Sequence, residues 1–221
     1  MIIDIKNISK TYGKDKNELL VLQDLSLKVE SPSSVAIIGK SGSGKSTFLS
    51  LGAGLDKPDS GSIVVNNKDI TSLSESELAT FRAKNIGIIF QQFHLMKNLT
   101  ALENVLLPLE ILKIENPLAK AKECLKKVGL EQRAAHFPHE LSGGEKQRVA
   151  IARAIVTEPR VIFADEPSGN LDEETGREVM SLLFDLVKNV GTTMILVTHD
   201  IELSKRCDEI YQLKNHRLEK Q

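Results

Sequence analysis

Residues 39–46 read Gly-Lys-Ser-Gly-Ser-Gly-Lys-Ser and fit the pattern G-x-x-x-x-G-K-[ST] of a phosphate-binding loop. Gly42 and Gly44 let backbone N–H groups approach a phosphate closely, and the helix expected to begin near Lys45 presents its positive end to the same anion. The alternative is a chance glycine-rich turn, but an apolar strand is predicted before the loop and a helical stretch, residues 47–53, after it. The loop therefore limits the chain to folds in which a buried strand leads into a phosphate-binding helix.

Four short apolar runs lack alternation, which is typical of strands covered on both faces. They lie at residues 35–38, 86–90, 161–164 and 194–197. The first run leads into the phosphate loop, and each of the other three is followed by a polar residue. Open α/β sheets place their ligand crevice at the carboxyl ends of parallel strands. We therefore expect a parallel sheet with a ligand site at that edge.

The first thirty residues follow a different pattern, in which apolar and polar positions alternate. The alternating apolar positions are Ile3, Ile5, Ile8, Leu25, Leu27 and Val29. This pattern predicts an antiparallel layer with one wet face, placed before the phosphate loop.

A helical pattern runs from Thr100 to Val156. Its apolar stripes are Leu102, Val105, Leu106 and Leu109, and then Leu118, Ala121, Leu125 and Val128. We interpret residues 92–156 as a helical subdomain inserted between strands of the core.

Composition narrows the possible partners and locations. The 221 residues suffice for one α/β domain with a small insertion. A net charge of -1 gives no large positive field, so we expect no nucleic-acid partner. The N-terminus has no basic leader, and no run of about 18 uncharged apolar residues occurs, so we expect a chain that is neither exported nor membrane-spanning. Cys124 and Cys207 are expected to be reduced thiols rather than a disulfide or a metal site.

Polar residues of the loop and after the third apolar run can carry phosphate chemistry. Lys45 can neutralise β- and γ-phosphate oxygens, and the Ser46 hydroxyl can ligate Mg²⁺. Asp165 stands where a phosphate-loop enzyme holds its magnesium carboxylate, and Glu166 can act as the base for an attacking water. One of the two acids could instead be a solvated surface residue. An exposed acid pair after four apolar residues is otherwise hard to place, which favours the functional interpretation.

A second glycine-rich turn, Ser142-Gly143-Gly144-Glu145, follows about a hundred residues later. Ser142 and Glu145 form a capping box, which starts a helix without any need for glycine. The two glycines cost about 1 kcal/mol each against alanine, so they favour a phosphate that touches the bare backbone. Two anion-binding helix ends can serve one nucleotide only if the fold, or a dimer, brings them together.

Three further residues gain meaning from this context. Gln91 follows the second apolar run, and its amide oxygen can reach Mg²⁺ or the attacking water. His199 follows the fourth run and can donate to a γ-phosphate, although a lone histidine there is more often structural. Tyr12 is a candidate for stacking on a base, but an aromatic residue near a strand end is as often packing.

These motifs, in this order, resemble the ATPase subunits of ABC transporters over nearly the whole chain. The corresponding segments are the aromatic loop (Tyr12), Walker A (Gly39–Ser46), the Q-loop (Gln91), the signature (Leu141–Glu145), Walker B (Val161–Asp165), the catalytic glutamate (Glu166), the D-loop (Ser168–Asp172) and the H-loop (His199). Residues 90–95, 99–105 and 164–172 look like the lipoprotein-releasing and macrolide-exporting branch. Ser168 and Lys146 depart from the commoner threonine and glutamine without removing a chemical group.

The resemblance implies an ATPase that uses ATP and Mg²⁺. Its α/β fold is that of a phosphate-loop NTPase, with a RecA-like core, an N-terminal antiparallel β layer and an inserted α-helical subdomain. The single domain 1–221 divides into a catalytic core, 1–91 and 157–221, and the helical subdomain, 92–156. The resemblance also implies two copies that meet head to tail, so that ATP lies between the phosphate loop of one and the signature of the other.

The site residues implied by the resemblance fall into four groups. ATP is expected to contact Tyr12, Gly39, Lys40, Ser41, Gly42, Ser43, Gly44, Lys45, Ser46, Thr47 and Gln91. From the other copy it is expected to contact Ser142, Gly143, Gly144 and Glu145, with Asp172 in the neighbouring D-loop. The catalytic residues are Glu166, His199 and Lys45, and the magnesium ligands are Ser46, Gln91 and Asp165.

Three functions compete at this point. The first is an ATPase subunit at the cytoplasmic face of the inner or plasma membrane, which drives integral membrane permease subunits in export or in lipid or lipoprotein extraction. The second is a mechanotransmission or regulatory module that controls an envelope complex without transport. The third, a soluble ABC protein of DNA repair or translation, predicts a second cassette, a long heptad insertion or a basic tract, and the sequence has none.

Overall fold

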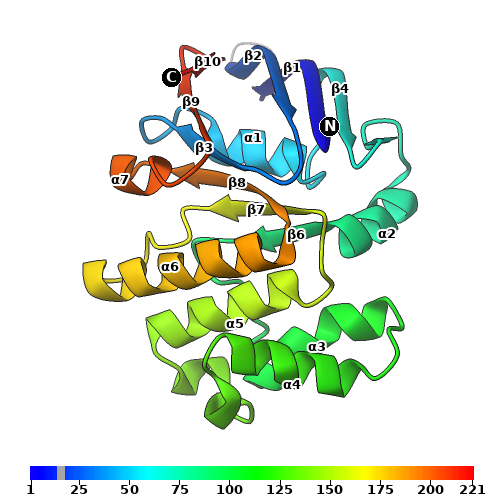
Figure 1. The fold of residues 1–221 in the computed structure, drawn as a ribbon. Helices are drawn as coiled ribbons and strands as arrows, with labels where there is room; N and C mark the ends of the chain where they lie inside the picture. The colour runs from blue at the N-terminus through cyan, green and yellow to red at the C-terminus, as the bar shows by residue number, and fades with distance from the viewer. Residues whose placement is uncertain (14–17) are drawn as a thin grey trace.

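A computed structural model of the chain describes residues 1–13 and 18–221, which form two sheets, with helices on both faces of the larger one (Figure 1). The larger sheet has the strand order β10-β9-β3-β8-β7-β6, and every neighbouring pair except β9 and β10 is parallel. Its strands are β3 (Ser34–Ile38), β6 (Ile86–Ile89), β7 (Val161–Asp165), β8 (Thr193–Thr198), β9 (Glu209–Lys214) and β10 (Arg217–Lys220). The four apolar runs are β3, β6, β7 and β8, so the predicted parallel sheet is confirmed.

The smaller sheet is antiparallel and has the order β2-β1-β4-β5. Its strands are β1 (Ile3–Tyr12), β2 (Leu19–Val29), β4 (Ser60–Val65) and β5 (Lys68–Asp69). The expectation that this layer lies wholly before the phosphate loop is wrong, because β4 and β5 follow the loop. Ile63 and Val65 of β4 are buried against the same core as β1, which explains why a strand from beyond the loop completes the layer.

The helices cover both faces of the larger sheet. They are α1 (Lys45–Gly52), α2 (Glu75–Asn85), α3 (Ala101–Ile111), α4 (Pro117–Lys127), α5 (Gly143–Ile155), α6 (Glu173–Val190) and α7 (Ile201–Ser204), with short 3-10 turns at Glu131–Arg133 and Pro138–Glu140. The helical pattern from Thr100 onward corresponds to α3, α4 and α5. Besides α3 and α4, α5 also contacts β6 and α6, and the boundaries of the helical subdomain at 92 and 156 stay a prediction.

Two hydrophobic cores lie on opposite faces of the larger sheet. Alternate residues of β7 serve both: Phe163 joins the core that includes the smaller sheet and α1, and Ile162 joins the core that includes α3 to α6. α1 and α5 therefore lie on opposite faces, as Figure 1 shows. Across the residues that the structure describes, none of the helices is both long and apolar enough to cross a bilayer.

The C-terminal hairpin, β9 and β10, joins the two sheets. At its turn, the carbonyl of His216 accepts the N–H of Gln23 on β2 at 2.9 Å, and the imidazole Nδ1 lies 3.2 Å from the carbonyl of Val21. The end of the chain thus supports the strand that runs beside the phosphate loop.

Candidate active site

The phosphate loop links β3 to α1, as the sequence predicts. Lys45 is only 6% exposed, and its Nζ donates to the carbonyls of Gly39 at 3.0 Å and Lys40 at 3.1 Å. Gly44 precedes α1 at φ 99°, a conformation that favours glycine, and a Cβ there would lie 2.8 Å from Val21. Because Gly44 has no side chain to cap α1, the first N–H groups of the helix remain available to an anion.

Asp165 ends β7 and faces the loop. Its Oδ1 is buried and has no hydrogen-bond partner among the described residues. Burial, followed by repulsion from Glu166, raises the pKa of this carboxyl, although the Ser46 hydroxyl and the charge of Lys45 oppose that shift. An unpartnered carboxylate oxygen beside a serine hydroxyl fits a Mg²⁺ ligand pair. The described residues contain no group of three or more His, Cys, Asp or Glu side chains that could hold a metal.

Glu166 occupies the centre of the predicted catalytic group. Its carboxylate lies 3.1 Å from Nδ1 of His199 and 3.8 Å from Nζ of Lys45. Its backbone has φ 42°, and its N–H donates to the carbonyl of Val197 at 2.9 Å. A non-glycine residue in the left-handed region costs about 1–2 kcal/mol. The hydrogen bond to β8 therefore stabilises a backbone conformation of Glu166 that is unfavourable by itself, and so fixes the direction of its side chain.

The Q-loop is tied to the D-loop by a contact that the sequence did not suggest. Asn170 donates from Nδ2 to the carbonyl of Gln91 at 2.9 Å, and Nε2 of Gln91 lies 3.5 Å from Oδ1 of Asn170. A Cβ at Gly169 would lie 2.7 Å from that Nε2. An asparagine in a loop carries no chemical signal of its own, so the sequence predicts no separate role for Asn170. Asp172 accepts the Thr175 N–H at 3.0 Å and so caps α6.

The glycine-rich turn at Ser142 begins α5 with the predicted capping box. Ser142 Oγ accepts the Glu145 N–H at 3.2 Å, and the Glu145 carboxylate accepts the Ser142 N–H at 2.8 Å. The Ser142 N–H, followed by the Arg133 side chain, lowers the pKa of Glu145. Gly144 also has a packing reason to be glycine, since a Cβ there would lie 2.5 Å from Thr175 on α6.

The structure brings together Lys45, Asp165, Glu166 and His199, at the carboxyl ends of β3, β7 and β8. It does not bring the Ser142 turn to the phosphate loop of the same chain, because α5 and α1 cover opposite faces of the larger sheet. Tyr12 ends β1 and donates its hydroxyl to Asp56 at 2.8 Å. The roles of all these residues stay predictions.

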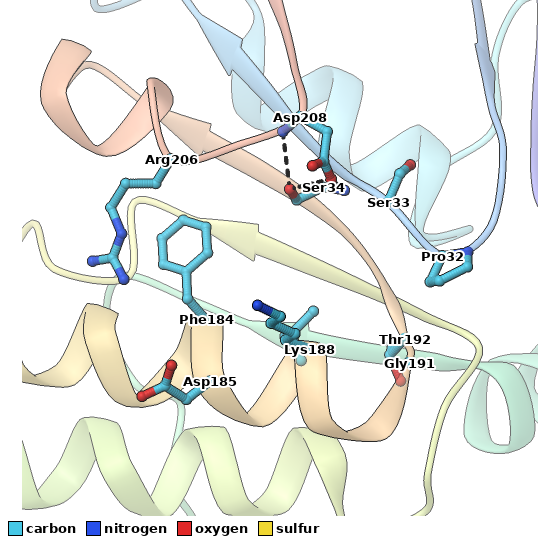
Figure 2. Close-up of a pocket in the computed structure, with 11 residues that line it drawn as sticks. Pro32, Ser33, Ser34, Phe184, Asp185, Lys188, Gly191, Thr192, Arg206 and Asp208 are labelled. Atoms are coloured by element: carbon cyan, nitrogen blue, oxygen red, sulfur yellow. Dashed lines mark hydrogen bonds between the residues drawn. The ribbon is translucent and has the colours of Figure 1, made fainter.

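The described surface has one cavity lined by predicted site residues and another that lies apart from them. One, of about 720 Å³, is lined by Glu166, His199 and the D-loop. Figure 2 shows the other, of about 420 Å³, which lies between α6 and the segment before β9. There the Arg206 guanidinium stacks 4.2 Å from the centre of the Phe184 ring, and Ser34 is hydrogen-bonded to Asp208. None of the predicted site residues lines this second cavity.

Comparisons with known proteins test the family that the sequence resembles. A family model described as ABC transporter matches residues 22–169. The ABC transporter ATP-binding protein MJ1508 of Methanocaldococcus jannaschii is 47% identical over 97% of this chain and 96% of its own length. The lipoprotein-releasing system ATP-binding protein LolD of Francisella tularensis is 43% identical, with coverages of 99% and 96%.

A solved structure extends the agreement to the fold. The dimeric ATP-binding cassette MJ0796, bound to ADP and Pi, matches with a TM-score of 0.90 and 41% identity, over 99% of this chain and 98% of that chain. The predicted α/β phosphate-loop NTPase fold is thereby confirmed, and the chain belongs to the ABC transporter family of ATP-binding proteins.

Proposed function

We propose that the cluster of Lys45, Asp165, Glu166 and His199 is the hydrolytic centre of this ATP-binding subunit. The observation that carries the proposal is the Glu166 carboxylate, 3.8 Å from a buried ammonium and 3.1 Å from an imidazole at the edge where three parallel strands end. As an ABC transporter ATPase, the chain converts ATP and water to ADP and phosphate and uses the reaction to drive transport.

Each residue has a distinct part in this proposal. Lys45 binds β- and γ-phosphate oxygens together with the free N–H groups at the start of α1. Ser46 and Asp165, with Gln91 from the next strand end, would hold Mg²⁺, which supplies positive charge to the phosphates when bound. Glu166 takes a proton from the water that attacks the γ-phosphorus as the bond to the leaving ADP oxygen breaks. His199 orients the Glu166 carboxylate and can donate to the γ-phosphate.

A second copy of the chain completes the site. The Ser142 turn cannot serve the phosphate loop of its own chain, so Ser142, Gly143 and Gly144 of a partner bind the triphosphate from the other side, with Asp172 at the interface. The dimeric cassettes that match this chain support this arrangement.

The ATP-driven change in the dimer is passed to separate membrane subunits. A groove of about 410 Å³ directly after Gln91, lined by residues that include Phe93, Leu95 and His139, can take a short helix of a permease subunit on the cytoplasmic face of the membrane. The match to a lipoprotein-releasing protein favours lipoprotein extraction or export as the work done.

The test of the hydrolytic centre is Glu166→Gln in the full chain. ATP turnover with Mg²⁺ should fall by about 10²- to 10⁴-fold, the range for loss of a general base, while ATP binding persists. The matched control is Glu123→Gln on the exposed surface of α4, which should leave turnover unchanged. Rapid turnover by Glu166→Gln would reduce Glu166 to a structural acid.

A further inference from the structure

Tyr12 is held in place by a residue at the far end of the phosphate-binding helix. Its hydroxyl donates to Oδ2 of Asp56 at 2.8 Å, across 44 positions of sequence. Asp56 lies in the turn after α1, the helix that begins at Lys45. The ring at the end of β1 and the phosphate loop are therefore joined through α1 and the turn that follows it.

Lys10 completes this contact. Its side chain is almost buried, and its Nζ donates to Oδ1 of Asp56 at 3.0 Å and to the carbonyl of Lys57 at 2.7 Å. Both oxygens of the Asp56 carboxylate are thus engaged, one by the ammonium and one by the phenol. The same ammonium lies 5.0 Å from the centre of the Tyr12 ring, over one of its faces.

The protonation states of Tyr12 and Asp56 fix which of the two donates the hydrogen bond. Burial alone would raise the pKa of Asp56, but the hydrogen bonds from Tyr12 and Lys10 outweigh it and lower the pKa. Burial, followed by the bond to the Asp56 carboxylate, raises the pKa of Tyr12. Asp56 therefore remains a carboxylate and Tyr12 remains a donor at neutral pH, so the hydrogen bond has a single polarity.

The ring itself stays accessible. Tyr12 is 41% exposed although its hydroxyl is bound and Lys10 lies over one face, so the opposite face is the one left for a ligand. An aromatic face fixed before binding loses less side-chain entropy when a flat base stacks on it.

We propose that Asp56 and Lys10 are positioning residues that hold Tyr12 as a platform for the nucleotide base at a fixed distance from the phosphate loop. The proposal rests on the proposed function of that loop, and it assigns the pair a part in selecting a base-bearing triphosphate over a bare one. Asp56 and Lys10 act only through the ring, so their effect should appear with ATP and not with inorganic triphosphate.

The experiment compares dissociation constants of the full chain for ATP and for inorganic triphosphate by calorimetry. Tyr12→Phe keeps the ring and the Asp56–Lys10 pair but removes the donor, and Asp56→Ala removes the acceptor. Each should weaken ATP binding about three- to tenfold, the range expected for loss of one ordinary hydrogen bond, and leave triphosphate binding unchanged. Asp56→Asn, which keeps an acceptor oxygen, should restore part of the loss.

A double variant separates positioning from general stability. With Tyr12→Ala in place there is no ring to orient, so adding Asp56→Ala should not weaken ATP binding further. The proposal is overturned if Asp56→Ala and Tyr12→Phe weaken both ligands equally, if they leave ATP binding unchanged, or if the effect of Asp56→Ala survives in the Tyr12→Ala chain. A wild-type chain that binds neither ligand would instead defeat the proposed function of the phosphate loop itself.

Discussion

Among single residues, Lys45 and Lys40 make the clearest contrast, because both lie in the phosphate loop and only one uses its side chain there. The Lys45 ammonium is buried within the loop, whereas Lys40 contributes a carbonyl and exposes its side chain. Lys45→Ala should weaken ATP binding by about 10- to 100-fold, as expected for loss of charge-assisted hydrogen bonds, and Lys40→Ala should have little effect. Calorimetric titration with Mg-ATP checks both variants. An equal loss of ATP affinity in the two would mean that any positive charge in the loop suffices and that the position of Lys45 is not special.

Residue types at motif positions were predictable, but the contacts that orient them were not. Lys45, Asp165 and Glu166 have a chemistry that their spacing alone suggests. Asn170 and Asp56 are ordinary polar residues whose partners lie 79 and 44 positions away, so only the folded chain shows what they hold. The sequence therefore predicts the reacting groups of the candidate site, but not the contacts that hold those groups in place.

The helices α5 and α2 begin with the same Ser-x-x-Glu capping box, but only the first turn of α5 is proposed to bind ATP. Ser142 caps α5 at the proposed trans site, and Ser74 caps α2 with Glu77, away from it. Ser142→Ala should lower the free energy of unfolding by about 1 kcal/mol, and Ser74→Ala by a comparable amount, as loss of an N-cap does. Only Ser142→Ala should also weaken the ATP-stabilised dimer on a sizing column; equal weakening by both would indicate a purely structural cap.

The groove after Gln91 gives the second prediction at this scale. Met96 is 49% exposed and stands in the sequence between Leu95 and Lys97, which line the groove. Leu95 packs against the second core and is a poorer test of the surface. Met96→Glu should reduce co-purification with the membrane subunits while basal ATP turnover stays near normal. Ile111→Glu, at a 64% exposed position at the end of α3, is the matched control and should retain the partner.

Elements differed in how well their patterns predicted them. The parallel strands were found because continuous apolar runs fit few other structures. β1 departs from strict alternation between Ile5 and Ile8, and the pairing with β2 shows a register shift there, with Asn7 at φ 48°. α2 was missed because its apolar face is weak, although Ser74 followed by Glu77 is a capping signal that could have indicated it.

The whole molecule has its two predicted anion-binding helix ends, at the starts of α1 and α5, on opposite faces of the larger sheet, which leads to a prediction for mixed dimers. A chain with Lys45→Ala lacks a working phosphate loop, and a chain with Gly143→Asp places a carboxylate in the signature turn. Gly143 suits this purpose better than Gly144, because a Cβ at Gly143 lies 3.2 Å from the flexible end of Leu171, against 2.5 Å from Thr175 at Gly144. Purified heterodimers should retain, or trap, about one ATP per dimer, since one of their two sites combines an intact loop with an intact signature.

The homodimers of each variant are the controls and should trap none. If each site were built from a single chain, every site in the mixture would remain damaged and the heterodimer would also trap none. Trapping is a better measurement than turnover here, because hydrolysis could require both sites.

The hairpin of β9 and β10 contacts the phosphate loop indirectly, through β2. His216 lies 195 positions after Val21 and holds the strand against which Gly44, the glycine immediately before α1, is packed. Coupling between two parts of a molecule is reciprocal in free energy. If the hairpin steadies the loop, then ATP in the loop must steady the hairpin, and the amides of Arg217–Lys220 should exchange their hydrogens with solvent more slowly when nucleotide is bound.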